Sequence, residues 1–212
     1  RAKIEKEPNY SKVAGALAAN ALYKEVFRES VDSDTFELQY RKAFVQNIKK
    51  LVKAEIISAK LLDFDLKKIS EAMQPERDSL FKYLGLQILI DRYFTRHNNK
   101  IMETPQAFWM RVAMGLAINE ENKEERAIEF YNLFSNMLYT PSTPTLFNSG
   151  TTHSQLSSCY LNTFDDSIDG IFEGVWQEAR KSKYAGGLGF DVTNFRSSGS
   201  FIKGTNGISG GL

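Results

Sequence analysis

The chain of 212 residues has a single cysteine, Cys159, and only two histidines. One cysteine excludes an intramolecular disulfide and any zinc site built from several cysteines, so this thiol is either packed or reactive. The charges are nearly balanced, with 27 Lys and Arg against 26 Asp and Glu. The chain therefore lacks the overall basic field that favours nucleic acid, and any recognition of phosphate has to be local.

Long apolar runs are also missing. None approaches the roughly 20 residues that a membrane-spanning helix needs, and the opening sequence RAKIEKEPNY lacks the apolar core of a secretory signal. We therefore expect a cytoplasmic protein without a membrane anchor. The chain begins at Arg1, without a methionine, and ends in a glycine-rich stretch, so we expect it to be part of a longer polypeptide.

Apolar residues at helical spacing predict a succession of helices over residues 1–139. Pro75 and Thr104-Pro105 are typical of helix starts, His97-Asn98-Asn99 is expected to end a long helix, and Pro141 and Pro144 are expected to stop the helices. The apolar stripes are, in chain order, Val13, Leu17 and Ala21; Phe36, Phe44, Ile48, Leu51 and Val52; Leu80, Leu84, Ile88 and Phe94; Phe108, Val112 and Leu116; and Phe130 and Met137.

After Pro144 the pattern predicts a strand, a helix and a second strand. The strands are expected at 155–161 and 190–193, and Asp165-Asp166-Ser167 offers capping side chains for the helix between them. The apolar positions of that helix are Ile168, Ile171, Phe172, Val175 and Ala179. Such a series forms a parallel crossover unit. The predicted fold class is therefore α/β but mostly helical, with a helical domain at 1–139 and the opening unit of an α/β domain at 140–212.

This second part contains four motifs in series: TPSTPTLFNSGT, QLSSCYL, DSIDGI and AGGLGFDVTNFRSSGSFIKGTNG. In order and spacing they resemble the catalytic (large, alpha) subunit of class I ribonucleotide reductases. The preceding helical part, with its EPNYSKVA start, is similar to the N-terminal helical region of that subunit. The resemblance implies that residues 140–212 open a ten-stranded α/β barrel on which the helical domain packs.

Cys159 is the candidate catalytic residue. A lone cysteine near Leu156, Tyr160 and Leu161 can be simply a small buried hydrophobic residue. The resemblance instead implies that it is one member of a redox-active cysteine pair beside the substrate ribose, because a dithiol supplies two electrons by closing to a disulfide. Its partner cysteine and the thiyl-radical cysteine would lie on sequence outside this chain.

Thr143, Ser158 and Gly187 are the substrate-binding residues that the resemblance implies. Their hydroxyls and a close backbone approach can donate hydrogen bonds to diphosphate and ribose oxygens. Without the resemblance, Thr143 is a turn residue and Gly187 a helix stop. In an ideal strand Ser158 and Cys159 face opposite sides, so for both to touch substrate the strand has to twist or end near them.

The resemblance also implies an allosteric specificity site for a deoxynucleoside triphosphate at a dimer interface. Asp166, Ser167 and Ile168 at the helix start, with Arg196 and Lys203 on the following loop, would form it. An acid can accept a bond from a sugar hydroxyl, and two cations can gather around a triphosphate.

Lys183, at the end of the same helix, is a further candidate for this site. As alternatives, Asp166 is an ordinary N-cap, Lys183 a favourable charge near a helix C-terminus, and the loop cations are solvated. Lys203 stands where some family members have arginine, and it lacks the bidentate fork of that side chain.

The implied activity is radical-initiated reduction of ribonucleoside diphosphates to deoxyribonucleotides. The chain itself is expected to bind no metal and no cofactor. The implied partners are the rest of the catalytic subunit, a small radical-generating subunit that holds the metal cofactor, thioredoxin or glutaredoxin, and a second copy in a homodimer.

Three alternatives remain open from the sequence. One is a noncatalytic helical nucleotide-binding or interaction module with a glycine-rich tail. Another is a cysteine-nucleophile hydrolase or transferase, for which His153 is the nearby candidate base. Within the resembled family, a cobalamin-dependent or anaerobic reductase is the third.

Overall fold

The computed structural model describes residues 7, 9–184 and 186–211, so Pro8 of EPNYSKVA and Ala185 of AGGLGFDV lie outside the described residues. The chain forms two compact units, Arg1–Leu156 and Ser157–Leu212, and each is described by itself. This division differs from the predicted one after residue 139. Residues 140–156 join the first unit because Gly150 O accepts a hydrogen bond from Ser58 N at 2.9 Å and Thr151 pairs with Ile57.

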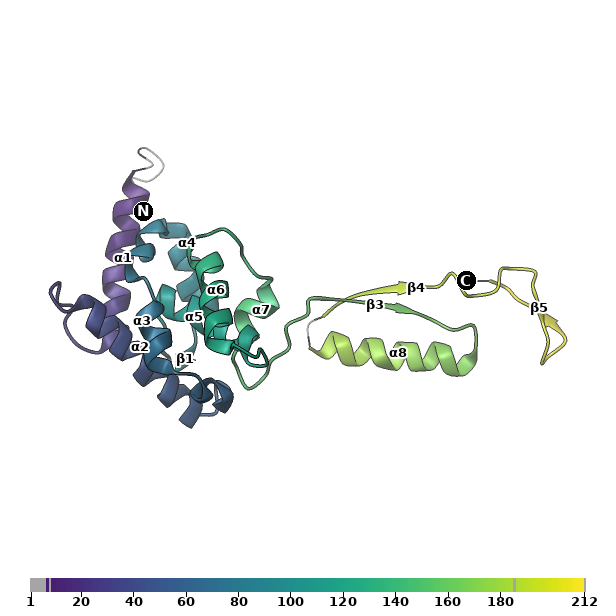
Figure 1. Cartoon of the computed structure of the whole chain (residues 1–212). Helices are drawn as coiled ribbons and strands as arrows, with labels where there is room; N and C mark the ends of the chain where they lie inside the picture. The colour runs from purple at the N-terminus through teal and green to yellow at the C-terminus, as the bar shows by residue number, and fades with distance from the viewer. Residues whose placement is uncertain (1–6, 8, 185, 212) are drawn as a thin grey trace. The chain divides into compact units, whose positions relative to one another are not determined.

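The first unit is built almost entirely of helices (Figure 1). Its elements are α1 (Tyr10–Phe27), α2 (Phe36–Lys53), the 3-10 helix η1 (Ala59–Asp63), α3 (Leu66–Ala72), the 3-10 helix η2 (Pro75–Leu80), α4 (Tyr83–Ile88), the π-helix η3 (Leu89–Tyr93), the hairpin strands β1 (Arg96–His97) and β2 (Lys100–Ile101), α5 (Pro105–Ala117), α6 (Lys123–Ser135) and α7 (Thr143–Asn148). No helix among the described residues is long and apolar enough to cross a membrane.

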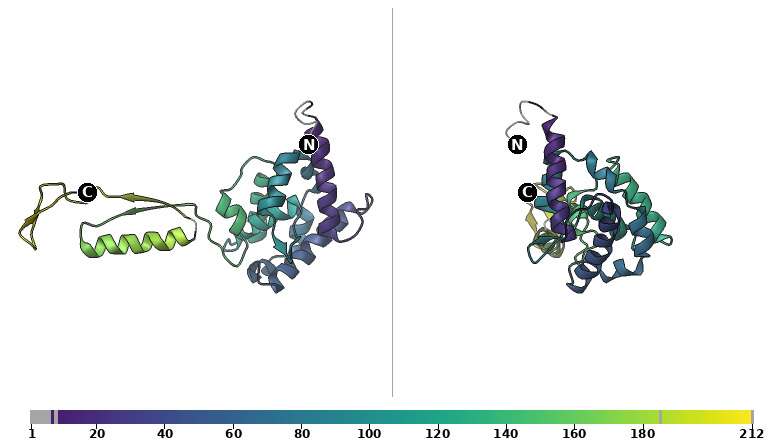
Figure 2. Two further views of the ribbon diagram at one scale, coloured as in Figure 1. Left: turned by 180° about the vertical axis from the view of Figure 1, so that it is seen from behind. Right: turned by 90° about the vertical axis from the view of Figure 1, so that its left-hand side faces the viewer.

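Helix α5 forms the centre of this unit. Its first ten residues are buried all round, which is typical of a helix enclosed by others (Figures 1 and 2). The predicted start at Thr104-Pro105 is confirmed, and Phe108 and Val112 are completely buried. In α2 the predicted stripe is likewise confirmed in Phe44, Ile48 and Leu51.

The apolar stripe predicted on α1 faces outward instead. Val13 is 56% exposed and Leu17 68%, whereas Gly15 and Ala19 are buried. The small residues are buried because the backbone of residues 81–83 passes close by, and a Cβ on Gly15 would lie 3.0 Å from Phe81 O. Close backbone packing thus decides the buried face of this alanine-rich helix.

The single long helix predicted from Pro75 is wrong. Phe81 and Lys82 adopt extended backbone conformations, which separate η2 from α4, and Leu80, Leu84 and Ile88 are exposed. After η3 the chain turns through Asn98 and Asn99, both at positive φ (51° and 60°), to form the β1–β2 hairpin. Asparagine tolerates this left-handed conformation well.

Pro144 starts a helix rather than stopping one. It occupies the first turn of α7, where its missing N–H is not needed. The end of α7 is anchored from α5, because Ser149 Oγ donates to Val112 O at 2.7 Å.

The second unit contains the predicted strand, helix and strand. Strand β3 (Cys159–Thr163) pairs in parallel with β4 (Gly187–Asp191), and α8 (Ile168–Lys183) crosses between them (Figure 2). A short hairpin of β5 (Phe201–Ile202) and β6 (Gly207–Ile208) follows. The α/β class, mostly helical, is thereby confirmed, although β3 begins and ends later than the predicted strand at 155–161 and β4 begins and ends earlier than the one at 190–193.

Helix α8 begins at the predicted N-cap, since Ser167 Oγ accepts a hydrogen bond from Gly170 N at 3.0 Å. Its predicted apolar stripe is not buried within the unit, because Ile168 is 72% exposed and Phe172 67%. Gly174 faces the strands instead, and a Cβ there would lie 2.6 Å from Phe164 Cδ1. The apolar side of α8 is left open.

Candidate functional site

The thiol of Cys159 lies at the first residue of β3, directly opposite Gly187 of β4. Ser158 O accepts a hydrogen bond from Gly187 N at 2.7 Å, and Ser158 Oγ lies 3.7 Å from Cys159 Sγ. All three residues are exposed. The structure therefore brings together three of the four residues predicted for catalysis and substrate binding.

This geometry resolves the difficulty of two neighbouring residues facing opposite sides. Ser158 lies just before β3 rather than inside it, so its hydroxyl can turn toward the sulfur. A Cβ at position 187 would lie 3.8 Å from the sulfur, so glycine leaves space beside the thiol. An accessible thiol next to a hydroxyl donor and an open stretch of backbone is able to meet a polar substrate.

Thr143 lies in the first unit, at the first residue of α7. It is exposed, and its Oγ1 lies 3.4 Å from the hydroxyl of Tyr93. His153, the base required by the cysteine-nucleophile alternative, also belongs to the first unit, whereas Cys159 belongs to the second.

A cavity of about 320 Å³ lies at the N-terminal end of α8. Four of the residues predicted for effector binding line it, namely Asp166, Ser167, Ile168 and Arg196. The sequence did not identify the rest of its lining, which is Ile171, Phe195, Ile202, Ser209 and Gly211. Ile171 could have been found, since it follows Ile168 by three residues on the same helix face.

Ser209 is brought to this cavity by hydrogen bonds that extend the β5–β6 hairpin. Ser209 O accepts from Gly199 N at 2.9 Å, and Ser209 N donates to Ser200 O at 2.8 Å. The Asn206-Gly207 step in the turn, with Asn206 at a positive φ of 56°, is a local signal that could have predicted this hairpin.

Asp166 and Arg196 form an ion pair at the edge of this cavity. Arg196 Nε lies 2.6 Å from Asp166 Oδ2, and Nη2 donates to Asp166 O at 3.2 Å. The two side chains are about one-third exposed, at 31% and 35%. The sequence-based interpretation treated them as an acceptor for sugar and a cation for phosphate, whereas here each neutralises the other.

Lys183 and Lys203 do not line the cavity. Lys183 ends α8, and that helix spans about 24 Å at 1.5 Å per residue. Lys203 is exposed in the turn between β5 and β6. Lys183 is thus separated from the other four predicted effector residues, whereas Lys203 directly follows the lining residue Ile202 without lining the cavity itself. Among the described residues, no cluster of three or more His, Cys, Asp or Glu side chains could hold a metal ion.

Comparison with known proteins agrees with the fold and the motifs. Residues 79–154 match the family model of the ribonucleotide reductase all-alpha domain, and residues 157–212 match that of the ribonucleotide reductase barrel domain. These matches adjoin the division between the two compact units at Leu156 and Ser157.

Curated relatives are similar along nearly the whole chain. The ribonucleoside-diphosphate reductase subunit alpha of Chlamydia trachomatis is 48% identical over 212 residues, which are 100% of this chain and 20% of that protein. The subunit alpha of Helicobacter pylori is 39% identical over 205 residues, which are 96% of this chain and 25% of that protein. The ribonucleoside-diphosphate reductase large subunit of Monkeypox virus is 40% identical over 209 residues, which are 97% of this chain and 26% of that protein.

The chain thus spans about a fifth to a quarter of the length of these relatives. The predicted resemblance is confirmed by two adjacent family models and by relatives similar over 96–100% of the chain. The chain belongs to the family of ribonucleotide reductase large (alpha) subunits, with one segment in the all-alpha domain and the next in the barrel domain.

Proposed function

We propose that this chain is part of the catalytic subunit of a ribonucleoside-diphosphate reductase and that Cys159 supplies reducing electrons. The observation that supports this best is the exposed thiol beside the Ser158 hydroxyl and the side-chain-free Gly187. Family membership adds support from the relatives, whose names state reduction of ribonucleoside diphosphates.

The chemistry requires two thiols. Replacing the 2′ hydroxyl of a ribose by hydrogen consumes two electrons and two protons and releases water, and two thiols supply both when they close to a disulfide. Cys159 is the only cysteine of this chain, so its partner has to come from elsewhere in the enzyme. A thiyl radical on a further cysteine, generated with the help of a small metal-containing subunit, would start the reaction at the ribose 3′ hydrogen.

Substrate binding is proposed for Thr143, Ser158 and Gly187. The two hydroxyls can donate hydrogen bonds to phosphate or ribose oxygens, and the missing side chain of Gly187 allows a sugar to approach the sulfur. Reduction of the disulfide by thioredoxin or glutaredoxin would complete the cycle, because exchange requires a thiol that a second protein can reach.

Allosteric control is proposed for the cavity at the start of α8. Asp166, Ser167, Ile168 and Arg196 would hold a deoxynucleoside triphosphate there, with Lys183 and Lys203 contributing from outside the cavity. The open apolar side of α8 supports pairing with a second copy of the subunit, since exposed apolar surface of this kind is typical of an interface. Leu161 of β3 is 86% exposed, which supports a further part of the barrel covering this face of the strand pair.

Replacement of Cys159 in the complete large subunit tests this function. With the small subunit and thioredoxin present, Cys159→Ser should lower turnover to deoxynucleotide by about a thousandfold or more, because one of two reducing thiols is lost. Binding of a deoxynucleoside triphosphate should change less than about twofold.

Ser154→Ala provides the control, since Ser154 is another exposed small polar side chain in the same part of the sequence. It should keep full turnover. Unchanged turnover of Cys159→Ser with thioredoxin would refute the role of this thiol as reductant.

A further inference from the structure

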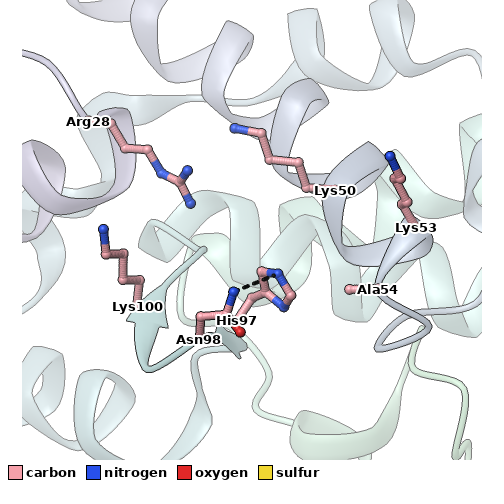
Figure 3. A pocket seen from close by; sticks show the side chains of 7 residues that line it. All are labelled: Arg28, Lys50, Lys53, Ala54, His97, Asn98 and Lys100. Carbon is pink, nitrogen blue, oxygen red and sulfur yellow. Dashed lines mark hydrogen bonds between the residues drawn. The ribbon is translucent and has the colours of Figure 1, made fainter.

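A second cavity, of about 480 Å³, lies in the first unit between the C-terminal ends of α1 and α2 and the β1–β2 hairpin. Figure 3 shows Arg28 and Lys100 on one side, Lys50 and Lys53 on the other, and the ring of His97 between them. Ala54 and Asn98 complete the lining, so none of the described lining residues is acidic.

The four cations of this cavity lack carboxylate partners. Among the described residues, no carboxylate oxygen lies within 4.0 Å of Arg28, Lys50, Lys53 or Lys100. Many exposed lysines elsewhere in the described part of the unit also lack a carboxylate partner, so the distinguishing feature of this cavity is that four such cations line it together.

Helix ends offset only part of this charge. Lys50 and Lys53 lie in the last turn of α2, and Arg28 follows the last residue of α1, where cations are favourable. A helix C-terminus carries about −0.5 of an elementary charge, so two of them balance about one of the four cations. Among the lining residues, an excess of about three positive charges remains to attract an anion.

Hydrogen-bond donors in the cavity are also left available. Arg28 Nη2 contacts the sulfur of Met102 at 3.5 Å, a weak acceptor that uses one of the five N–H groups of the guanidinium. The side chain of Asn98 lies 3.3 Å from His97 Nε2, which fixes the imidazole beside the cations. The turn at Asn98 and Asn99, with its positive φ angles, brings this hairpin end to the two helices.

We propose that this cavity binds a compact polyphosphate, such as the triphosphate of a nucleotide. An anion with several charges matches the excess better than a single carboxylate does, and Arg and Lys are the side chains that bind phosphate oxygens. The volume lies in the range of small-molecule sites. A long nucleic acid would need a basic stripe, whereas the chain as a whole is nearly neutral, with a net charge of +1.

This site is separate from the cavity at the start of α8, because the two belong to different compact units. It therefore does not depend on the proposed effector site. The experiment has to resolve the two locations, since a nucleotide can bind at either.

Amide NMR of the whole 212-residue chain, titrated with inorganic tripolyphosphate and with ATP, provides the test. Saturable chemical-shift changes are expected at the amides of Lys53, Asn98 and Lys100. They should appear independently of any change at Ser167, which lines the cavity at the start of α8. Equal affinity for the two ligands would assign recognition to the phosphates alone, and tighter binding of ATP would assign a nucleotide. Both results support a polyphosphate site.

Charge-matched variants distinguish a site from general attraction. Arg28→Ala and Lys50→Ala should each weaken binding about tenfold, because each removes a charged hydrogen bond. Lys49→Ala removes the same charge from the neighbouring exposed position, outside the cavity, and should change affinity less than about twofold. Circular dichroism of every variant confirms that the fold is kept.

Three results would overturn the proposal. One is the absence of saturable shifts at these amides with either ligand at millimolar concentration. Another is an equal loss of affinity in Lys49→Ala and Lys50→Ala, which would indicate attraction to surface charge alone. Binding of an acidic peptide in place of both phosphate ligands would also contradict it.

Discussion

Arg111 and Glu103 form a buried ion pair in the first unit, with Arg111 Nε 2.6 Å from Glu103 Oε1 and side chains 0% and 4% exposed. The remaining polar atoms have partners. Arg111 Nη1 donates to Ser149 O at 2.6 Å, and Glu103 Oε2 accepts from Thr95 N at 2.7 Å. The pair therefore joins the chain before α5, the middle of α5 and the end of α7, the helix that begins at Thr143.

Removing the cation of this pair should destabilise the unit strongly. We expect Arg111→Met to lower the free energy of unfolding by about 3–5 kcal/mol, because the Glu103 carboxylate is then buried without a cation to balance its charge. Urea unfolding followed by circular dichroism measures this. The double variant Glu103→Leu/Arg111→Met should recover part of the loss, since it removes both charges.

Arg126→Met is the matched control for Arg111→Met. Arg126 also pairs with a glutamate, Glu129, but its side chain is 52% exposed. Surface pairs contribute at most about 1 kcal/mol, so this variant should change stability little. Equal effects of the two arginine replacements would contradict the importance of burial.

Asp78 is the centre of a second buried network. Its Oδ2 accepts hydrogen bonds from the hydroxyls of Tyr23 and Tyr40, both at 2.8 Å, and its Oδ1 accepts from Gln106 Nε2 at 2.8 Å. Burial raises the pKa of this carboxyl to about 6, although the three hydrogen bonds oppose the rise. Gln106 extends the network by accepting from Tyr131 OH at 2.8 Å.

This raised pKa makes stability depend on pH. The folded state favours the protonated form of Asp78. The contribution of this carboxyl to the free energy of unfolding is therefore complete below the pKa of the unfolded chain, 3.8, and is lost as pH rises through the folded pKa of about 6. The difference of about two pH units corresponds to about 3 kcal/mol. Between pH 4 and 6.5 the free energy of unfolding of the wild type should fall by about this amount. The Asp78→Asn variant, whose side chain does not titrate, should not show this fall.

Urea unfolding at a series of pH values measures the difference between the wild type and Asp78→Asn. Asp63→Asn serves as the control. Because Asp63 is exposed, the free energy of unfolding of this variant should depend on pH as steeply as that of the wild type. Parallel pH profiles of the wild type and Asp78→Asn would show that this carboxyl is not the titrating group.

The sequence predicted features that depend on neighbours along the chain. The N-cap at Ser167 and the start of α5 at Pro105 follow from local hydrogen bonding and φ preferences, whereas Asn98-Asn99, expected to end a helix, form the turn of the β1–β2 hairpin. Cys159 and Gly187 could be assigned to one site only by the resemblance, and their pairing in register explains why they meet.

Features that depend on tertiary packing could not be predicted in this way. The outward face of α1 follows from the close approach of Phe81 to Gly15, which no periodicity reveals. The pairing of Asp166 with Arg196 joins residues 30 positions apart. The basic cavity also draws its residues from α1, α2 and the hairpin, so each of its cations looks like an ordinary surface charge in the sequence.

Two helical glycines should respond to alanine with opposite signs. In α5 a Cβ on Gly115 would overlap the backbone nitrogen of Gly150 and lie 2.6 Å from Ser149 C, and backbone cannot move aside cheaply. In α4 a Cβ on Gly85 would make an ordinary contact of 3.7 Å with Phe81 Cδ1. We expect Gly115→Ala to lower the free energy of unfolding by about 1–3 kcal/mol, because overpacking outweighs helix propensity. Gly85→Ala should raise the free energy of unfolding by up to about 1 kcal/mol, because alanine favours a helix more than glycine does. Urea unfolding measures both changes. Stabilisation by Gly115→Ala would contradict the close packing of α5 on the Ser149-Gly150 turn.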